Sequence, residues 1–136
     1  MTKLTIIGAG SAVFTKNIVA DLLSLDSFKN IEIALQDIDE KRLKASHDLL
    51  TVISQKLNAN PKITSHTNRR ESLAGSDFVQ TTIQVGGYKP STLIDFEIPK
   101  KFGLQQTIAD TLGIGGIMRG LRTIPVLLDI AKDIIE

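Results

Sequence analysis

Apolar positions along the chain follow two different spacings, and the change from one to the other separates the predicted elements. Leu4, Ile6 and Ile7 form a short apolar run that is typical of a buried strand. The next apolar positions recur at helical spacing, which predicts a helix with a buried stripe of Phe14, Ile18, Leu22 and Leu25. A strand followed at once by a helix is the first unit of an α/β fold.

The alternation of strand and helix continues past the middle of the chain. Further strands are predicted at 31–36, at 62–66 as a short edge strand, and at 78–85, with a helical turn at 70–73. A second helix has its apolar side on Leu43, His47, Leu50, Ile53 and Leu57. Strands separated by helices predict an α/β fold, a Rossmann-like doubly wound parallel sheet with helices on both faces. Its ligand crevice lies at the carboxyl ends of the strands.

The pattern becomes irregular between residues 86 and 116. A helix interrupted by Pro99 is predicted between Ser91 and Phe102. The remaining segment is rich in polar residues and glycine and starts at the carboxyl end of a strand, which favours a binding loop. A final amphipathic helix follows, and Pro125 is expected to kink or restart it. Its apolar side consists of Ile117, Leu121, Ile124, Leu128 and Ile135.

Candidate chemistry begins at the glycine-rich turn between the first strand and the first helix. Gly8 permits a tight bend, and Gly10 lets a pyrophosphate approach the backbone without a Cβ in the way. The helix that follows offers unpaired N–H groups and a positive dipole end to the phosphates. Ser11 has two open roles, as a hydroxyl donor to phosphate or as a helix cap. Val13 stands where the general fingerprint has a third glycine or alanine, so the motif is incomplete.

An acidic residue after the second strand favours a dinucleotide site over a purely structural turn. Asp37 lies 27 positions after Gly10. Its carboxylate is expected to accept hydrogen bonds from both ribose hydroxyls and to repel a 2′-phosphate, which favours NAD over NADP. Asp39 is the competing carboxylate, but it directly precedes a helical pattern and is therefore interpreted as a helix cap.

Composition narrows the class of protein without specifying an activity. The 136 residues suffice for about one domain, and the net charge of +1 argues against a nucleic-acid partner. The chain has no cysteine, so disulfides and thiolate metal ligands are excluded within it and secretion gains no support. Neither a signal peptide nor an apolar stretch of membrane-spanning length is predicted. We therefore expect a cytoplasmic protein that does not bind a membrane.

Several blocks of sequence resemble one enzyme family. They are Gly8-Ala9-Gly10-Ser11, Asp37-Ile38-Asp39, Val85-Gly86-Gly87-Tyr88, Gln106-Thr107-Ile108-Ala109-Asp110-Thr111-Leu112-Gly113, Gly115-Gly116-Ile117-Met118-Arg119 and Leu121-Arg122-Thr123-Ile124-Pro125. Together they resemble glycoside hydrolase family 4, in particular its α-galactosidase (melibiase) branch, and the block around Asp110 is the most specific. Because family members are considerably longer, residues 1–136 are expected to be the NAD-binding Rossmann-like domain at the N-terminus of a longer glycosidase.

The resemblance implies an unusual glycosidase chemistry, distinct from the usual pair of carboxylates. In the family, NAD⁺ takes hydride from C3 of the sugar, a tyrosine removes the C2 proton, the aglycone leaves, water adds and the hydride returns. A divalent metal, typically Mn²⁺, polarises the C2 and C3 oxygens. The metal ligands, the acid and the tyrosine are expected beyond Glu136. We therefore expect this chain alone to bind NAD without hydrolysing a galactoside, and the full-length protein to form a homo-oligomer.

The resemblance also assigns roles to individual residues. The family's cofactor-binding positions match Gly8, Ala9, Gly10, Ser11 and Asp37, and Gly86 and Gly87 are expected along the nicotinamide. Asp110 matches an acidic position that raises the basicity of the catalytic tyrosine, and the alternative is a loop carboxylate that caps a turn.

Substrate contacts and specificity are less narrowly assigned. Lys89 and Arg119 are candidate substrate contacts, but Arg119 and Arg122 have an equal claim to structural ion pairs. Ser91 lies near the position where members acting on 6-phosphorylated sugars place an arginine, which favours an unphosphorylated sugar. Besides an α-galactosidase for substrates such as melibiose, the alternatives are an α-galacturonidase or α-glucosidase of the same family. An NAD-dependent 2-hydroxy-acid dehydrogenase and a binding-only nucleotide module also remain open.

Overall fold

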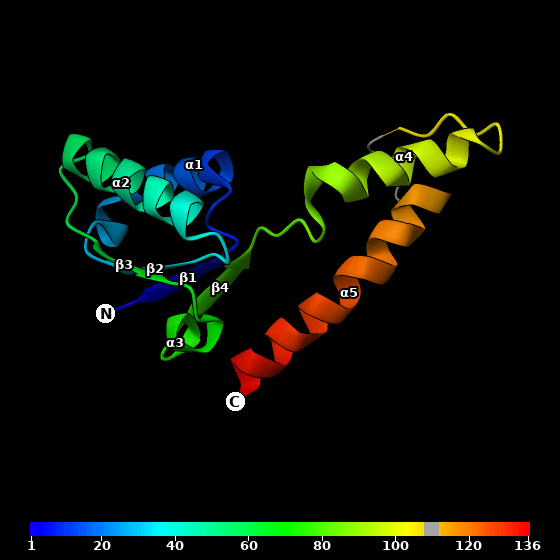
Figure 1. Ribbon diagram of the computed structural model, residues 1–136. Coiled ribbons are helices and arrows are strands. Elements are labelled where there is room, and N and C mark those ends of the chain that lie inside the picture. The colour runs from blue at the N-terminus through cyan, green and yellow to red at the C-terminus, as the bar shows by residue number, and fades with distance from the viewer. Residues whose placement is uncertain (108–111) are drawn as a thin grey trace. The chain divides into compact units, whose positions relative to one another are not determined.

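A computed structural model describes residues 1–107 and 112–136. These residues form two compact units, Met1–Ile83 and Gln84–Glu136. Figure 1 shows their elements, a sheet with helices in the first unit and helices with their connections in the second. In the part of the chain that is described, no helix is both long enough and apolar enough to cross a membrane.

The first unit is built on a four-stranded parallel sheet. Its strands are β1 (Lys3–Ile7), β2 (Glu32–Gln36), β3 (Lys62–His66) and β4 (Phe78–Thr81), in the order β3-β2-β1-β4. The order makes β3 an edge strand, as the sequence predicts. The two central strands are almost entirely buried, which is typical of parallel strands covered on both faces.

Helices cover both faces of this sheet, which confirms the Rossmann-like α/β fold. Helices α1 (Ala12–Leu23) and α2 (Glu40–Lys56) lie together on one face, and the short α3 (Arg69–Leu73) lies on the other (Figure 1). A single 3₁₀ turn, Asp26–Phe28, connects α1 to β2. The carboxyl ends of β1 and β2 therefore lie next to the first turns of α1 and α2, which is where a ligand crevice is expected.

The core of the first unit lies where β1 and β2 pack against α1 and α2. Its buried members are Leu4, Ile6, Ala9, Val19, Leu23, Ile31, Ile33, Leu35, Leu43 and Leu50. The predicted stripe of α1 is wrong at Phe14 and Leu25, whose side chains are 61% and 53% exposed. The buried positions are Thr15, Val19 and Leu23. Thr15 can be buried there because its hydroxyl donates a hydrogen bond to the carbonyl of Ala9 at 3.0 Å. A buried hydroxyl with a hydrogen-bond partner does not destabilise the core.

Strand β4 is shorter than predicted, because it ends at Thr81 and not at residue 85. Its neighbour β1 ends at Ile7, which is opposite Thr81 in the register. One further hydrogen bond, from the N–H of Thr82 to the carbonyl of Ile7, closes the ladder. Beyond that point Gly8 turns the partner chain away, so no strand remains to pair with residues 83–85.

The second unit consists of the helical turn η2 (Gly87–Thr92) and the helices α4 (Leu93–Lys100) and α5 (Ile114–Ile135). Helix α4 confirms the helix predicted between Ser91 and Phe102, but the predicted interruption at Pro99 is wrong, because α4 continues through it to Lys100. Pro125 does not restart the last helix, because α5 runs through it as one helix of 22 residues. The five apolar positions predicted for one side of α5 are all more than half exposed in the structure.

The N-cap of α2 provides a test of the local fold. The carboxylate of Asp39 accepts hydrogen bonds from the N–H groups of Lys41 and Arg42, at 3.0 and 3.1 Å, which confirms its interpretation as a cap. We expect Asp39→Ala to lower the free energy of unfolding by about 1 kcal/mol in chemical denaturation. Asp39→Ser, which restores a capping oxygen, is the control and should recover most of the loss. Equal stability of all three proteins would contradict the prediction.

Candidate functional site

The glycine-rich turn after β1 is a tightly constrained loop. Gly8 has a φ of +83°, and a Cβ at this position would overlap the carbonyl oxygen of Thr82. The N–H groups of Gly8 and Ala9 both donate to the carbonyl of Gln36, at the end of β2, at 2.9 Å each. Glycine is therefore required at position 8 both by the backbone angle and by the carbonyl of Thr82, just after β4.

The position of the turn is also fixed by the two helices that flank it. The carbonyl of Ala9 accepts hydrogen bonds from the hydroxyls of Thr15 in α1, at 3.0 Å, and Ser46 in α2, at 2.7 Å. Both hydroxyls are buried, and neither contact was predicted from the sequence. A small hydroxyl residue in the buried phase of a helix next to a glycine turn is the signal that would have found them.

The first turn of α1 opens next to this loop. Ser11 is the N-cap residue, but its side chain makes no capping hydrogen bond. Of its two predicted roles, the cap is therefore not formed, and the contact to phosphate stays a prediction. The first N–H groups of any α-helix have no intrahelical acceptor, so an anionic ligand at this end would find both free donors and a positive dipole. Val13 is 66% exposed, so the third position of the fingerprint does not pack against a strand here.

Asp37 links the end of β2 to the glycine turn. One carboxylate oxygen accepts a hydrogen bond from the N–H of Gly10 at 2.7 Å, and the other accepts from the N–H of Asp39 at 2.9 Å. A Cβ at Gly10 would lie 2.6 Å from the first of these oxygens. The close approach that requires glycine at position 10 is thus one to Asp37 itself. Each oxygen keeps a lone pair for a further donor.

These residues fit the diphosphate and ribose of a dinucleotide. A backbone without Cβ atoms at Gly10, an uncapped helix start at Ser11 and a fixed carboxylate at Asp37 come together at the carboxyl ends of two adjacent parallel strands. The first two suit an anion, and the carboxylate suits neighbouring hydroxyl groups. The arrangement suits a nucleotide cofactor and by itself offers no bond-breaking chemistry.

Comparison with known proteins identifies the family. The sequence profile described as family 4 glycosyl hydrolase matches residues 3–136. The chain belongs to glycosyl hydrolase family 4. It is 54% identical over 136 residues to an α-galactosidase of Bacillus subtilis, with 100% of this chain and 32% of that protein covered. It is 39% identical over 134 residues to an α-galactosidase of Rhizobium meliloti, with 98% of this chain and 27% of that protein covered.

Solved structures of 6-phosphoglucosidases share the fold. A 6-phospho-α-glucosidase from gut microorganisms, in complex with NAD and glucose-6-phosphate, matches with a TM-score of 0.86 and 28% identity. That match covers 99% of this chain and 30% of the other. Other structures with this fold were solved with NAD and manganese. The chain spans about a third or less of the length of the relatives it matches.

The segment Val85-Gly86-Gly87-Tyr88 lies in the second unit, where it forms a sharp turn that leads into η2. Gly86 and Gly87 have φ values of +82° and +65°. A Cβ at Gly86 would overlap the hydroxyl of Ser91, whereas one at Gly87 would meet no atom within 4 Å. Lys89 is exposed just after the turn. Contact of these residues with nicotinamide or sugar stays a prediction.

Arg119 and Arg122 gather around one buried carboxylate, that of Asp95 in α4. Arg122 donates to both of its oxygens, at 3.1 and 2.6 Å, and its Nε donates to the carbonyl of Val85 at 3.0 Å. The hydrogen bond to Asp95 raises the pKa of the Arg122 guanidinium. Arg119 donates to the hydroxyl of Thr92 at 3.2 Å and has its Nε 3.9 Å from Asp95. The structural ion pair predicted as one alternative is therefore present, and a substrate contact of Arg119 stays a prediction.

Two residues with clear structural roles in this unit were missed from the sequence. Asp95 is only 2% exposed, and its phase relative to the buried Thr92 and Pro99 is the signal that would have placed it on the inner face of α4. The side chain of Gln106 accepts a hydrogen bond from the N–H of Gly115 at 2.8 Å, in the first turn of α5. Asp110, the predicted modulator of the base, lies outside the described residues.

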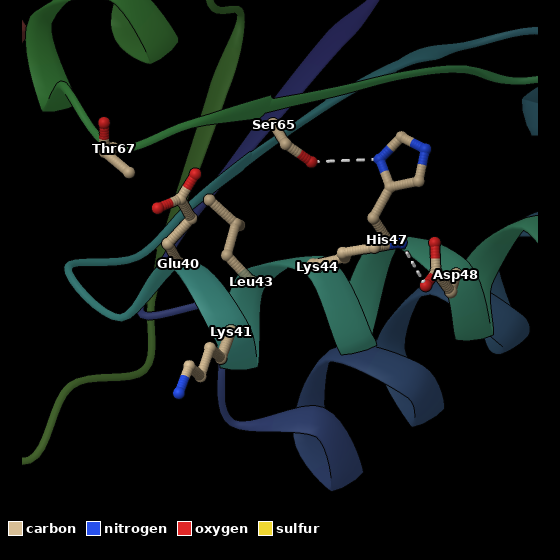
Figure 2. A pocket seen from close by; sticks show the side chains of 8 residues that line it. All are labelled: Glu40, Lys41, Leu43, Lys44, His47, Asp48, Ser65 and Thr67. Carbon is tan, nitrogen blue, oxygen red and sulfur yellow. Dashed lines mark hydrogen bonds and ion pairs between the residues drawn. The ribbon is translucent and has the colours of Figure 1, made fainter.

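A shallow groove of about 650 Å³ lies between α2 and β3 (Figure 2). Its polar groups are partly paired with one another, since His47 Nδ1 is 2.9 Å from the hydroxyl of Ser65 and Lys44 is 2.7 Å from Asp48. Neither Asp37 nor the glycine turn lines it. Within residues 1–107 and 112–136, no three His, Cys, Asp or Glu side chains come together as a metal site.

The carboxylate of Asp37 provides a test of the nucleotide site. We expect Asp37→Asn to weaken NAD binding by about tenfold, since it removes the charge from hydrogen bonds to the ribose, and to reduce the preference for NAD over NADP. Isothermal titration of the full-length protein with each nucleotide measures both effects. Asp48→Asn, an exposed carboxylate on α2, is the matched control. Unchanged affinity for both nucleotides in Asp37→Asn would rule out the assigned role.

Proposed function

We propose that this chain is the NAD-binding part of an NAD- and divalent-metal-dependent α-galactosidase that hydrolyses α-galactosides such as melibiose. The observation that carries the proposal is the hydrogen bond from the N–H of Gly10 to Asp37, because it holds a carboxylate beside a turn suited to a diphosphate. The 54% identity to a Bacillus subtilis α-galactosidase supports the choice of sugar.

The residues of the first unit would hold the adenosine and diphosphate half of the cofactor. Asp37 would accept hydrogen bonds from the ribose hydroxyls, and its charge would repel a 2′-phosphate. The turn at Gly8 to Ser11 would receive the diphosphate against the start of α1. NAD⁺, when bound, supplies a hydride acceptor for C3 of the sugar. The rigid anchoring of Ala9 by Thr15 and Ser46 would keep the site in its binding geometry before the cofactor arrives.

The other catalytic groups are proposed to come from parts of the full-length enzyme outside the described residues. The described residues form no metal site, so Mn²⁺ is proposed with ligands supplied elsewhere in the full-length protein. Asp110 is proposed to raise the basicity of the tyrosine base. Gly86 and Gly87 are proposed to lie along the nicotinamide, and Lys89 and Arg119 to contact the sugar. We also propose that the full-length protein forms a homo-oligomer.

The dependence on both cofactors tests the proposed function directly. With an aryl α-galactoside, the full-length protein should lose activity by at least about 100-fold after removal of NAD⁺ or treatment with a chelator, and each addition should restore it. The redox cycle closes, so no NADH should accumulate. The 136-residue chain alone should bind NAD and show no turnover. Hydrolysis that needs neither NAD⁺ nor metal would refute the proposal.

Specificity for an unphosphorylated sugar is tested by paired substrates. Ser91, near the position of the phosphate-binding arginine of other members, is packed against Gly86 and offers no charge to a phosphate. We therefore expect kcat/KM for an α-galactoside to exceed that for its 6-phosphate by about tenfold or more. The same comparison with α-glucosides and α-galacturonides tests the choice of sugar. A higher kcat/KM for the 6-phosphate would contradict this assignment.

A further inference from the structure

The turn at Val85, Gly86 and Gly87 is held by hydrogen bonds to its backbone from both sides. Arg122, in α5, donates to the carbonyl of Val85 at 3.0 Å, and the hydroxyl of Thr92 lies 3.5 Å from the carbonyl of Gly87. The N–H of Gly87 donates to the carbonyl of Gln84 at 3.1 Å. Two carbonyls and one N–H of a sharp turn are thus engaged within the second unit.

The side chains that hold the turn are themselves ordered by Asp95. Its carboxylate, with a side chain 3% exposed, accepts two hydrogen bonds from Arg122 and lies 3.9 Å from Arg119. Arg119 in turn donates to Thr92. A buried carboxylate needs charge-assisted partners, and removing its charge would release both guanidinium groups from their present geometry. Asp95 is therefore connected to the turn by two routes. One runs through Arg122 to Val85, and the other runs through Arg119 and Thr92 to Gly87.

The packing around Gly86 leaves the turn little freedom to move. The space that a Cβ would take is occupied by the Ser91 side chain, and Cδ of Arg122 lies 3.3 Å from the same point. Arg122 thus contacts the turn with its aliphatic stem as well as with Nε. A shift of this side chain would change both its hydrogen bond to the carbonyl of Val85 and its packing against Gly86.

We infer that Asp95 and Arg122 are positioning residues, which fix the Val85-Gly86-Gly87 turn in the place where it orients the nicotinamide against the sugar. The inference rests on the proposed function, in which this turn lies along the nicotinamide. A purely structural pair could be replaced by apolar side chains of similar volume at little cost in stability. A positioning pair replaced in the same way keeps its stability but loses activity, because an apolar side chain leaves the carbonyl of Val85 without its donor.

Arg122→Lys in the full-length enzyme distinguishes a positioning role of Arg122 from a purely structural one. A lysine keeps a positive charge beside Asp95, but its single ammonium does not reproduce the fork that binds the carboxylate and Val85 together. We expect kcat for an aryl α-galactoside to fall by about 10- to 100-fold, since a misplaced reacting group costs this much. The dissociation constant for NAD should stay within about threefold, because the adenosine half binds through other residues.

The deuterium isotope effect on kcat is a second readout, and it does not change when part of the protein is unfolded. With a substrate deuterated at C3, the isotope effect on kcat should rise in Arg122→Lys, because hydride transfer becomes slower relative to the other steps. The double variant Asp95→Leu, Arg122→Met fills the same space with apolar atoms and should show the same fall in kcat with near wild-type thermal stability. Glu97→Gln, an exposed carboxylate on the same helix as Asp95, is the matched control.

Each result has a distinct consequence. Wild-type kcat and isotope effect in folded Arg122→Lys and in the double variant would overturn the inference alone. A fall in kcat that only follows the folded fraction, with an unchanged isotope effect, would also overturn it. Galactoside hydrolysis by the wild-type enzyme without any need for NAD⁺ would overturn the proposed function and, with it, this inference.

Discussion

The hydrogen bonds of one carboxylate organise the candidate cofactor site. Asp37 accepts from the N–H groups of Gly10 and Asp39, and so joins the turn after β1 to the turn after β2. A charged acceptor makes these bonds stronger than those between neutral groups. The contact with Gly10 also explains why position 10 must be glycine.

The rest of the first unit supports this contact. Parallel pairing of β1 with β2 brings their carboxyl ends level, and the carbonyl of Gln36 then receives both N–H groups of the turn. Buried hydroxyls from α1 and α2 fix the carbonyl of Ala9. The polar groups of the loop are therefore satisfied by the fold itself, which leaves the helix start as the place where an anion would gain most.

In the second unit a glycine turn is also held in place by hydrogen bonds, but these come from side chains. There the carbonyls of a glycine turn are held by side chains, and those side chains depend on the buried Asp95. A buried carboxylate bound by a forked guanidinium is costly to form and strongly directional. Asp95 lies close to the turn at Val85-Gly86-Gly87, to which it is connected through Arg122.

Local patterns predicted much of this protein correctly. Three strands, the cap at Asp39 and the parallel α/β fold follow from signals within a few residues of each element. The errors arose where a choice depended on a partner outside the element itself. The phase of α1 was wrong because the hydroxyl of Thr15 finds an acceptor in the glycine turn, and β4 was too long because β1 ends at Ile7.

The sequence by itself determined the fold class, the glycine turn and the family. The spacing of apolar residues and short motifs indicate all three, and both can be recognised without a structure. Only the tertiary structure decided what each polar residue contacts. Gly10 proved to face Asp37, Ser11 proved not to cap its helix, and Arg122 proved to join Asp95 to Val85. The physical reason is that hydrogen bonds and ion pairs between residues far apart in the chain exist only after the backbone has brought them within about 3 Å.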